Sequence, residues 1–553
     1  MHPSLLCALL PVLSLASSPS SWAQEGLSSP AVSARDIGTH IEALASDAFG
    51  GRGPGTDGEA RAVRYLVDRF SDYGLEPGAG DGWLQQVPMI ELTPMGAPDA
   101  GFDVGGRSLE ILSGRDVMLW SPVTEGATAV EASEVVFCGH GIVAPEYGWD
   151  DYAGVDVRGK TAVVLVNDPG FRRPDQGLFR GNAMTYYGRW TYKFEEAERQ
   201  GAAACLIVHE DAAAGYGWTV VAQSWGRPQL QLESGREEPV TRVRGWVSLD
   251  AAMTLFEQAG QDLAALARAA AEPGAKPVPL TGATFRAAFE NRVARTVSPN
   301  VIGRVTGSTH PDEVVLVTAH WDHLGTRPGA PEEDNVYNGA VDNASGTALM
   351  LELAEAAAAM DPPPARSIVF VATTAEEKGL LGSKHYAQNP SYPLARTVCG
   401  LNVDVANTLG PMEDIVVVGF GASELDADLR VVAAAQGRRV VPEATPEKGF
   451  YFRSDHFSLA KVGVPMLYTN TGTTSVDRGA EWVAKQKRDF ERKRYHRVRD
   501  EFDAEWDLEG AAEDGRLFLA LLTLWSNDAR WRAWAPDSEF RAAREASLAA
   551  AKK

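Results

Sequence analysis

The stretch that decides the fold is EVVLVTAH, residues 313–320. It is a continuous apolar run that ends in a polar residue, which predicts a strand buried on both faces. Two later stretches, SIVFVATTAEE at 367–377 and CGLNVDV at 399–405, have the same form. The apolar positions of 347–360 predict a helix between the first two strands. Strand, helix and strand in this order predict an α/β fold with a mostly parallel mixed sheet flanked by helices.

Residues that bind metals stand at the end of each predicted strand. The segment GAVDNASG, residues 339–346, precedes the predicted helix, and YHR at 495–497 supplies a late histidine. Ligands bind outside the carboxyl ends of strands in open α/β sheets, so these side chains are expected to converge. Imidazoles and carboxylates without thiolates suit zinc, and one carboxylate can bridge two ions about 3.5–4 Å apart. The candidate ligands and their neighbours are His320, Asp322, His323, Asp342, Glu376, Glu377, Asp404 and His496.

Each carboxylate also has an ordinary structural explanation. Asp342 would serve equally well as the N-cap of the following helix. Glu376 and Glu377 would be a solvated charge pair, but adjacent carboxylates at the end of a buried strand favour a cation. Asp404 lies within LNVDV, where burying an unpaired carboxylate is costly, so it too favours a cation.

Histidines elsewhere compete for the same role. His323, His385 and His456 are alternatives to His320, which is favoured because Asp322 lies two residues away and can orient its ring. Ser454, Asp455 and His456 are contiguous, so their side chains cannot converge as a catalytic triad. The sequence contains neither a GxSxG nor an HExxH motif, which argues against a serine hydrolase and a single-helix zinc site.

The amino-acid composition indicates the class of protein. The chain has 553 residues, of which 44% are hydrophobic and 23% charged, as in a soluble globular protein of several domains. Its formal net charge of −22 argues against nucleic acid and against anionic membrane surfaces as partners. No CxxC motif is present, which argues against a thiolate zinc site.

The N-terminal residues 1–23 predict a signal peptide. An apolar run at 5–16 is followed by Ser and Pro residues and by a small-residue cleavage site after Ala23, although the first residues lack the usual basic charge. The run is too short to span a bilayer, so no stable membrane insertion is expected after cleavage. We therefore expect an exported protein, either periplasmic or secreted.

The pattern of predicted strands and helices divides the remaining chain into three parts. Short strands with a single helix between them recur from residue 128 to 280. Before them, an amphipathic segment at 36–74 is followed by a β-rich stretch at 85–119, and alternating strands and helices are expected from residue 298 onward. We expect an inserted β-rich domain at 128–280, with 24–127 and 281–553 forming the main domain. An Ala-rich helix at 251–271 is expected near its end. The aromatic segment MTYYGRW, residues 184–190, predicts either an exposed platform for peptides or the insert's own core.

Taken together, the motifs resemble the co-catalytic zinc aminopeptidases of clan MH, such as the bacterial leucyl aminopeptidases. The matching segments are SDAFGGRGPGT (46–56), TAHWDHLG (318–325), YNGAVDNASG (337–346), TTAEEKGLLGS (373–383), LNVDV (401–405) and YHRVRDEFD (495–503). The insert, with FCGHGIVAPEYGWDDYAGVDVRGK at 137–160 and RQGAAACLIVH at 199–209, resembles a protease-associated (PA) domain. This resemblance implies a zinc-exopeptidase fold of the phosphorylase/hydrolase type.

The resemblance also implies a role for each residue. It places one zinc ion on His320 and Asp404, a second on Glu377 and His496, and Asp342 as the bridge between the two. Glu376 would be the general base, Asp322 the partner of His320, and Tyr495 a residue near the reacting carbonyl. In some relatives the peptide bond after the bridging Asp is cis, which makes Asp342–Asn343 a candidate. The segment Arg497–Val498–Arg499 departs from the form that is usual after His496.

The function that the resemblance implies is an exported di-zinc aminopeptidase. Such an enzyme hydrolyses N-terminal residues from peptides through a metal-bridging hydroxide, with Glu376 as general base. The alternatives are a carboxypeptidase or a glutaminyl-cyclase-like enzyme on the same scaffold, or a receptor-like binding protein without catalysis. Peptides are the expected partners, and neither the side-chain specificity nor the oligomeric state follows from the sequence.

Overall fold

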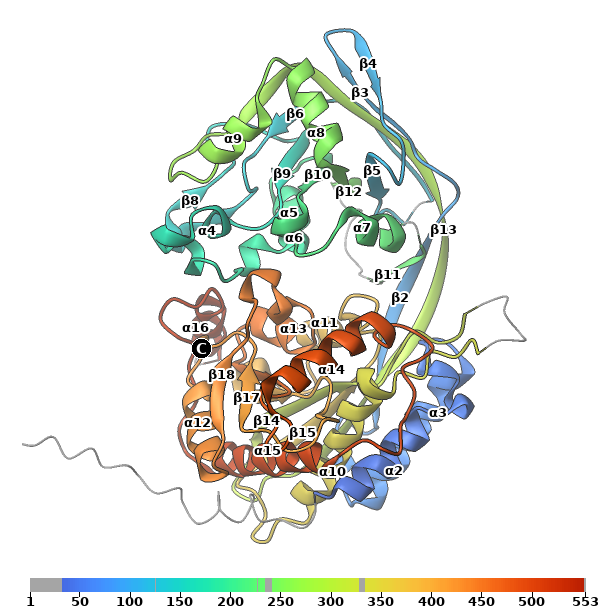
Figure 1. Cartoon of the computed structure of the whole chain (residues 1–553), viewed down its shortest axis with the longest axis vertical. Coiled ribbons are helices and arrows are strands. Elements are labelled where there is room, and N and C mark those ends of the chain that lie inside the picture. Colours follow the sequence, from blue (N-terminus) through green and yellow to red (C-terminus); the bar gives the residue numbers. More distant parts are fainter. Residues whose placement is uncertain (1–31, 125, 226, 234–240, 328–333, 552–553) are drawn as a thin grey trace, which may run out of the picture.

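Two lobes, one above the other, make up the molecule in the computed structural model (Figure 1). The structure describes residues 32–551 apart from 125, 226, 234–240 and 328–333. The predicted signal peptide at 1–23 lies outside the described residues. The lower lobe contains the strands that end in candidate ligands, and the upper lobe contains most of the predicted insert.

A mixed sheet forms the centre of the lower lobe. Its strands lie side by side in the order β2, β13, β15, β14, β16, β19, β17 and β18. Strands β15, β14, β16 and β19 are mutually parallel, which confirms the predicted α/β fold with a mostly parallel centre. The strands span Leu84–Pro94 (β2), Val278–Val305 (β13), His310–His320 (β14), Arg366–Thr373 (β15), Thr397–Asn402 (β16), Asp414–Val417 (β17), Arg439–Pro442 (β18) and Met466–Asn470 (β19).

Helices cover both faces of this sheet because successive strand residues point to opposite sides. Val315 and Val317 of β14 pack on one side with helices α2, α3, α10, α12 and α15. Val314 and Leu316 pack on the other side with helices α11 and α13. No helix in the described part of the chain is long and apolar enough to cross a membrane. The helices span Ala34–Leu44 (α2), Asp57–Asp72 (α3), Gly346–Ala358 (α10), Leu381–Gln388 (α11), Leu425–Ala435 (α12), His456–Lys461 (α13) and Glu509–Asn527 (α15).

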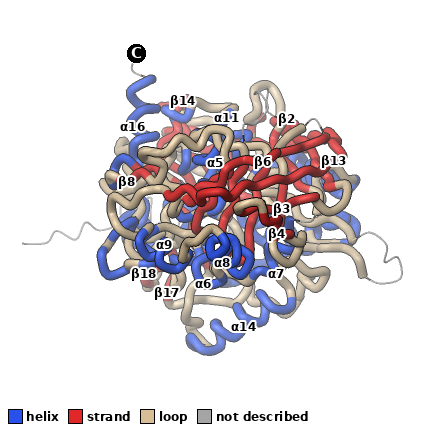
Figure 2. The backbone as a smooth tube through the Cα atoms, turned by 90° about the horizontal axis from the view of Figure 1, so that it is seen from above, coloured by secondary structure: helices blue, strands red, loops and turns tan. Residues whose placement is uncertain are grey.

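The upper lobe has its own sheet. Its strands lie in the order β4, β3, β13, β6, β9, β10, β12 and β5, and β6, β9, β10 and β12 are parallel. Seen from above, β13, β6 and β3 run side by side across the lobe (Figure 2). The strands span Asp99–Val104 (β3), Arg107–Glu110 (β4), Val117–Trp120 (β5), Ala127–Phe137 (β6), Thr161–Leu165 (β9), Ala204–His209 (β10) and Val243–Ser248 (β12).

Strand β13 belongs to both sheets. Residues 278–290 pair with β3 and β6 in the upper lobe, and residues 291–305 pair with β2 and β15 in the lower lobe. The upper lobe therefore extends beyond the predicted insert of 128–280 at both ends. Its sheet also takes in strands β3, β4 and β5, which precede residue 128, because β3 pairs with β13 and β5 with β12.

The Ala-rich segment at 251–271 forms two helices rather than the single one expected. Helix α8 spans Leu249–Gln258 and helix α9 spans Leu263–Ala269. Gly260 separates them with a positive φ of 73°, and the side chain of Asp262 caps the second helix by accepting from Ala265 N. A residue in the left-handed region cannot continue a helix, and the cap then starts a new one.

The aromatic segment at 184–190 joins the two lobes. Tyr186 is 7% exposed, and its ring lies 4.9 Å from that of Phe457 of the lower lobe. The Tyr186 hydroxyl donates to Glu195 (2.6 Å) and accepts from Lys461 of the lower lobe (2.8 Å). Both sequence hypotheses for this segment were therefore wrong for Tyr186, which lies neither on an exposed platform nor in a core confined to the upper lobe.

Tyr186→Ala is expected to weaken the junction between the lobes. Loss of a buried aromatic ring lowers the free energy of unfolding by about 3–5 kcal/mol. Amide hydrogen exchange should become faster at 184–192 and at 450–461, on both sides of the junction, and stay unchanged in β9. Tyr186→Phe is the matched control, because it keeps the ring and loses about 1 kcal/mol with the hydroxyl. Unchanged exchange at 450–461 in Tyr186→Ala would contradict the role of the segment.

Candidate metal centre

The predicted ligands meet at the carboxyl edge of the lower sheet. His320 is the last residue of β14, Glu377 follows β15 by four residues, and Asp404 follows β16 by two. Asp342 lies in the irregular turn that leads into α10. His496 comes from the loop after α14 (Gly479–Lys493), which passes over the same edge. All five side chains therefore converge from segments that are far apart in the sequence.

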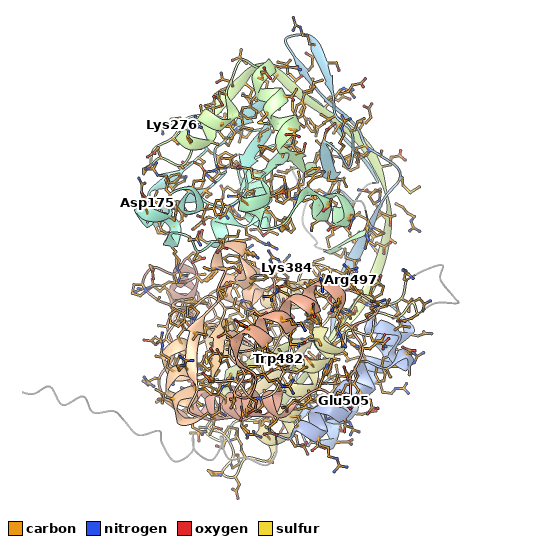
Figure 3. All side chains as sticks on the ribbon, in the orientation of Figure 1. Asp175, Lys276, Lys384, Trp482, Arg497 and Glu505 are labelled. Carbon is orange, nitrogen blue, oxygen red and sulfur yellow. The ribbon has the colours of Figure 1, made fainter. Side chains whose placement is uncertain are left out.

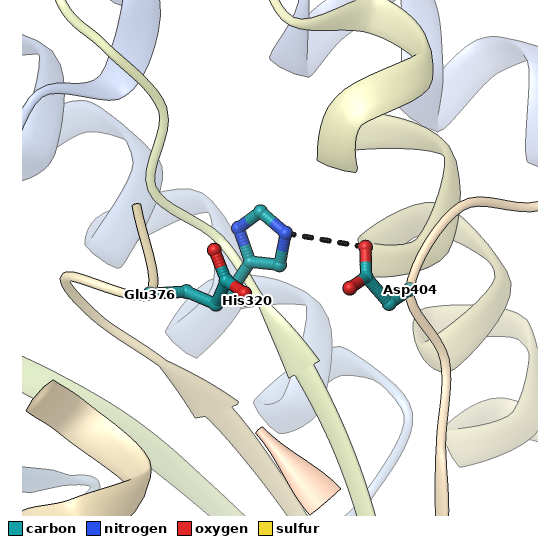
Figure 4. Close-up of side chains that lie close together, drawn as sticks. All are labelled: His320, Glu376 and Asp404. Atoms are coloured by element: carbon teal, nitrogen blue, oxygen red, sulfur yellow. Dashed lines mark ion pairs between the residues drawn. The ribbon is translucent and has the colours of Figure 1, made fainter. Parts of the chain in front are cut away.

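His320, Asp342 and Asp404 form one half of the centre. The Nε2 atom of His320 lies 3.4 Å from Asp342 Oδ1. It also lies 3.4 Å from Asp404 Oδ1, and Figure 4 marks this ion pair with a dashed line. His320 is 1% exposed, and its backbone carbonyl accepts from the Thr347 hydroxyl at 2.8 Å. This hydrogen bond joins the end of β14 to the start of α10.

His496, Asp342 and Glu377 form the other half. The Nε2 atom of His496 lies 3.3 Å from Asp342 Oδ2 and 3.0 Å from Glu377 Oε2. Asp342 thus directs one carboxylate oxygen to each half. The two halves share a single carboxylate, which is the arrangement that a pair of ions about 3.5–4 Å apart requires.

The turn that holds Asp342 is fixed by hydrogen bonds to its backbone. The Asp342–Asn343 peptide bond is cis, as the family resemblance implied. Asn343 Oδ1 accepts from Gly346 N (3.0 Å) and Val405 N (2.9 Å), so it joins this turn to the segment that carries Asp404. Asp500, which sequence reasoning missed, accepts from Asp342 N (3.1 Å).

Asp500 belongs to the YHRVRDEFD motif, so its place in this motif could have indicated a functional role. Its carboxylate also accepts from Val341 N (3.2 Å), and its carbonyl accepts from Ala340 N (2.9 Å). Burial raises the pKa of Asp500 to about 6, against these backbone N–H donors. One motif therefore supplies both a candidate ligand, His496, and the group that positions the shared carboxylate.

The sequence offered His323 only as an alternative to His320, but the structure places it next to the candidate metal centre. It is fully buried, and its Nδ1 lies 2.7 Å from Glu377 Oε1. Its ring centroid is 6.0 Å from that of His496. His323, Asp342 and Glu377 could themselves hold an ion, because their ligand atoms lie within 4.8 Å of one another. His496 fits the ligand position better, because its Nε2 faces both Asp342 and Glu377, whereas His323 contacts Glu377 and orients it.

Glu376 lies beside the first half. One of its carboxylate oxygens lies within 4.8 Å of ligand atoms of His320 and Asp404, and Figure 4 shows it next to the His320 ring. Burial raises the pKa of Glu376 well above its ordinary value, His320 opposes this, and the charges of Asp404 and Glu377 add to it. Glu376 is therefore a carboxyl that holds a proton more readily than an ordinary glutamate.

Asp322 contacts His320, the partner that the resemblance implied, although not through its carboxylate as expected. Its backbone carbonyl, rather than its carboxylate, is nearest to His320 Nδ1, at 3.1 Å against 3.7 Å. The carboxylate accepts from Glu376 N at 3.0 Å. Burial raises the pKa of Asp322 to about 7, with His320 opposing and Glu377 adding to the effect. Asp322 thus orients the His320 ring through its main chain and fixes the Glu376 backbone through its side chain.

Tyr495 and the remaining histidines complete the account of the predicted residues. The Tyr495 ring stacks on His496 with centroids 3.9 Å apart and is half exposed. Arg497, the next residue but one, lies at the edge of the lower lobe that faces the upper lobe (Figure 3). His456 is buried between the rings of Tyr451 and Tyr468, away from Ser454, whose hydroxyl accepts from Asn402 Nδ2. The structure therefore contains no triad at 454–456.

The donor set fits two zinc ions. It consists of two imidazole nitrogens and three carboxylates, which zinc accepts; Asp342 is buried, and Glu377 and Asp404 are partly buried. Burial lowers the pKa of both imidazoles, yet the carboxylates outweigh it. Glu377 and Asp342 raise the pKa of His496 to about 10, and Glu376, Asp342 and Asp404 raise that of His320. The cluster thus attracts positive charge, as a cation site must.

Comparison with known proteins agrees with this chemistry. Residues 300–521 match the sequence model described as Peptidase family M28. A stretch of 124 residues is 39% identical to the aminopeptidase YwaD of Bacillus subtilis, and one of 130 residues is 32% identical to the mouse aminopeptidase NAALADL1. These stretches cover 22% and 23% of this chain, but only 24% and 16% of the relatives' own lengths. A probable zinc metalloprotease of Pyricularia oryzae is 43% identical over 89 residues, 16% of this chain and 17% of that protein.

Two solved structures align with most of this chain. The aminopeptidase of Aneurinibacillus sp. strain AM-1 aligns over 90% of this chain and 95% of its own, with a TM-score of 0.48 and 19% identity. The zinc aminopeptidase BSAP of Bacillus subtilis aligns over 92% and 97%, with a TM-score of 0.41 and 18% identity. The sequence match covers residues 300–521, the segment that carries the candidate metal centre.

Removing one ligand from each half tests the assignment of the centre. We expect Glu377→Gln and Asp404→Asn each to retain one zinc ion where the unmodified chain holds two, because each loses a charged ligand of one half only. Zinc content per chain, measured by mass spectrometry after gel filtration, gives the result. Asp428→Asn is the matched control, because this carboxylate pairs with Arg532 (2.7 Å) and has no contact with the centre. Two retained ions in Glu377→Gln would show that its carboxylate is not a ligand.

Proposed function

We propose that this chain is a zinc aminopeptidase that removes N-terminal residues from peptides. The observation that supports it most strongly is the position of Asp342, whose two oxygens face His320 on one side and His496 on the other. The similarity of residues 300–521 to peptidase family M28, and the aminopeptidase names of the relatives, favour peptides as substrates.

In this proposal His320 and Asp404 hold one zinc ion, Glu377 and His496 hold the second, and Asp342 binds both. Bound zinc supplies Lewis acidity that polarises the scissile carbonyl and lowers the pKa of a water molecule. The chain's own contribution is to fix the ligands. His323 holds Glu377 at 2.7 Å and Asp500 holds the backbone of Asp342, and such outer contacts orient metal ligands.

Glu376 is the proposed general base and acid. Its buried carboxylate accepts a proton from the attacking water and then donates it to the nitrogen of the leaving amine. The raised pKa suits both steps, because the group must be deprotonated at the start and protonated in between. Asp322 keeps Glu376 in place by accepting from its backbone N–H.

Export is part of the proposal. It is supported by the apolar run and the small-residue cleavage site at the N-terminus, which predict removal of residues 1–23 and release into the periplasm or the medium. The N-terminal sequence of the exported protein tests this directly: a mature chain that begins at Gln24 is expected.

A substrate panel distinguishes the proposed activity from its alternatives. The purified chain should cleave an aminoacyl p-nitroanilide and a free peptide from its N-terminus, and should leave the N-acetylated peptide intact. Cleavage from the C-terminus would indicate a carboxypeptidase instead, and conversion of an N-terminal glutamine to pyroglutamate would indicate a cyclase. Bound peptide without turnover by the zinc-loaded chain would favour a receptor-like protein.

Glu376→Gln separates proton transfer from metal binding. The amide keeps the shape of the side chain but cannot accept a proton, so kcat should fall by about 10²–10⁴-fold while both zinc ions and KM are retained. Glu505→Gln is the matched control, because Glu505 is exposed on the surface of the lower lobe (Figure 3). Loss of zinc from Glu376→Gln would make this residue a ligand, and full activity would exclude it as the base.

A further inference from the structure

Arg52 is a buried cation at the centre of the GGRG turn, a motif that no step of the proposed mechanism uses. The turn is packed between two loops of the metal centre. A Cβ atom on Gly51 would lie 2.2 Å from Gly325 O and 2.6 Å from Tyr337 O, so only glycine fits there. Arg52 itself is 1% exposed and has a positive φ of 49°. Its carbonyl accepts from His323 N.

The guanidinium of Arg52 donates to four backbone carbonyls. Nε donates to Trp321 O (2.9 Å), in the segment between His320 and Asp322. Nη1 donates to Asn338 O (2.6 Å) and Nη2 to Gly339 O (2.9 Å), in the loop that leads to Asp342. Nη1 also donates to Leu44 O at the end of α2 (2.7 Å).

This planar group therefore links the two segments that carry His320 and Asp342. Those residues face each other at 3.4 Å across the first half of the centre. The five N–H donors of an arginine form a rigid fork, so the hydrogen bonds set the spacing of the carbonyls that accept them. The position of Trp321 relative to Gly339 is fixed by one side chain.

Among the described residues, Arg52 forms no ion pair. In the part of the chain that the structure describes, no carboxylate oxygen lies within 4.0 Å of it. The carboxylates that act on it from further away are those of Asp322, Asp500, Asp342 and Glu377. Burial lowers the pKa of Arg52 to about 10, against the effect of these four groups, so it stays charged at neutral pH. A buried charge that is hydrogen-bonded but has no carboxylate in contact is costly, which makes its position here informative.

We propose that Arg52 is a positioning residue of the metal centre, which holds the His320 and Asp342 segments at the spacing that the two ions need. Its charge lies beneath a group of carboxylates and offsets their mutual repulsion when the ions are absent. The inference rests on the assignment of His320 and Asp342 as zinc ligands in the proposed function. The proposal gives the GGRG motif a role, which is to preorganise the site before metal binds.

Zinc affinity of Arg52→Lys tests this role. Lysine keeps the charge but cannot span four carbonyls, so the affinity for zinc, measured by competition with a chelator, should fall by about 10–100-fold, the usual effect of losing an outer contact of a metal site. The visible absorption spectrum of the Co²⁺-loaded protein should shift, because it reports the ligand geometry. Arg52→Gln, which keeps an amide donor and loses the charge, should weaken zinc binding further and lower the melting temperature of the metal-free protein.

Arg544→Lys is the matched control. Arg544 is also buried and also donates to backbone carbonyls, Leu394 O (3.0 Å) and Thr397 O (2.7 Å), but at the end of β16 opposite Asp404. It should lower the melting temperature and leave zinc affinity and the Co²⁺ spectrum unchanged. An Arg52→Lys protein with the zinc affinity and spectrum of the unmodified chain would overturn the proposal.

The remaining outcomes also decide the question. Arg52 variants that fold only when zinc is added support the proposal, and variants that stay insoluble with zinc assign Arg52 to folding alone and overturn it. An unmodified chain that binds two zinc ions but cleaves no peptide would refute the proposed function and leave the affinity comparison valid. An unmodified chain that binds no zinc would overturn both.

Discussion

The register of three parallel strands is the constraint on which the metal centre depends. His320 of β14 lies opposite Thr373 of β15, and Thr318 lies opposite Asn402 of β16, so the strands stop at one common edge. Each chain segment then places its carboxylate or imidazole within a few residues of that edge. A slip of one residue in any strand would turn its side chains to the opposite face and scatter the ligands. The packed cores on both sides of the sheet, which hold the register, therefore serve the chemistry directly.

Sequence reasoning brought the candidate ligands His320, Glu377 and Asp404 together because each comes at or after the end of an apolar strand that can be recognised in the sequence. The stretches before His320, Glu377 and Asp404 are apolar on both faces, so a charged residue after them needs a partner. The same reasoning could not find Arg52 or Asp500. Both act through backbone groups of loops, and which loop lies beside them depends on contacts between residues some 160 to 290 positions apart. His323 was seen but ranked too low, because one-dimensional spacing does not show that its Nδ1 faces Glu377.

The boundaries of the upper lobe were less predictable than its existence. Recurrent short strands indicated a β-rich unit. Its sheet also includes strands β3, β4 and β5 from the segment before residue 128 and the first part of β13. Sequence patterns locate a domain boundary only where the predicted secondary structure changes. Strand β13 remains a strand throughout while it passes from one sheet to the other, so no such change marks the boundary. The aromatic residues at 184–190 were ambiguous for a related reason: their composition indicates burial, and only the fold shows that Phe457 of the other lobe is what buries Tyr186.

The shared strand has a consequence for how the upper lobe can be exchanged. An inserted domain that hangs from two loops can be removed or replaced by cutting the loops. Here the cut would fall inside a continuous strand, between Glu290 and Asn291, and would expose hydrogen-bonding edges of two sheets at once. The lobe is thus not a detachable module. A different lobe at this place would have to supply its own continuation of β13 in register with the lower sheet.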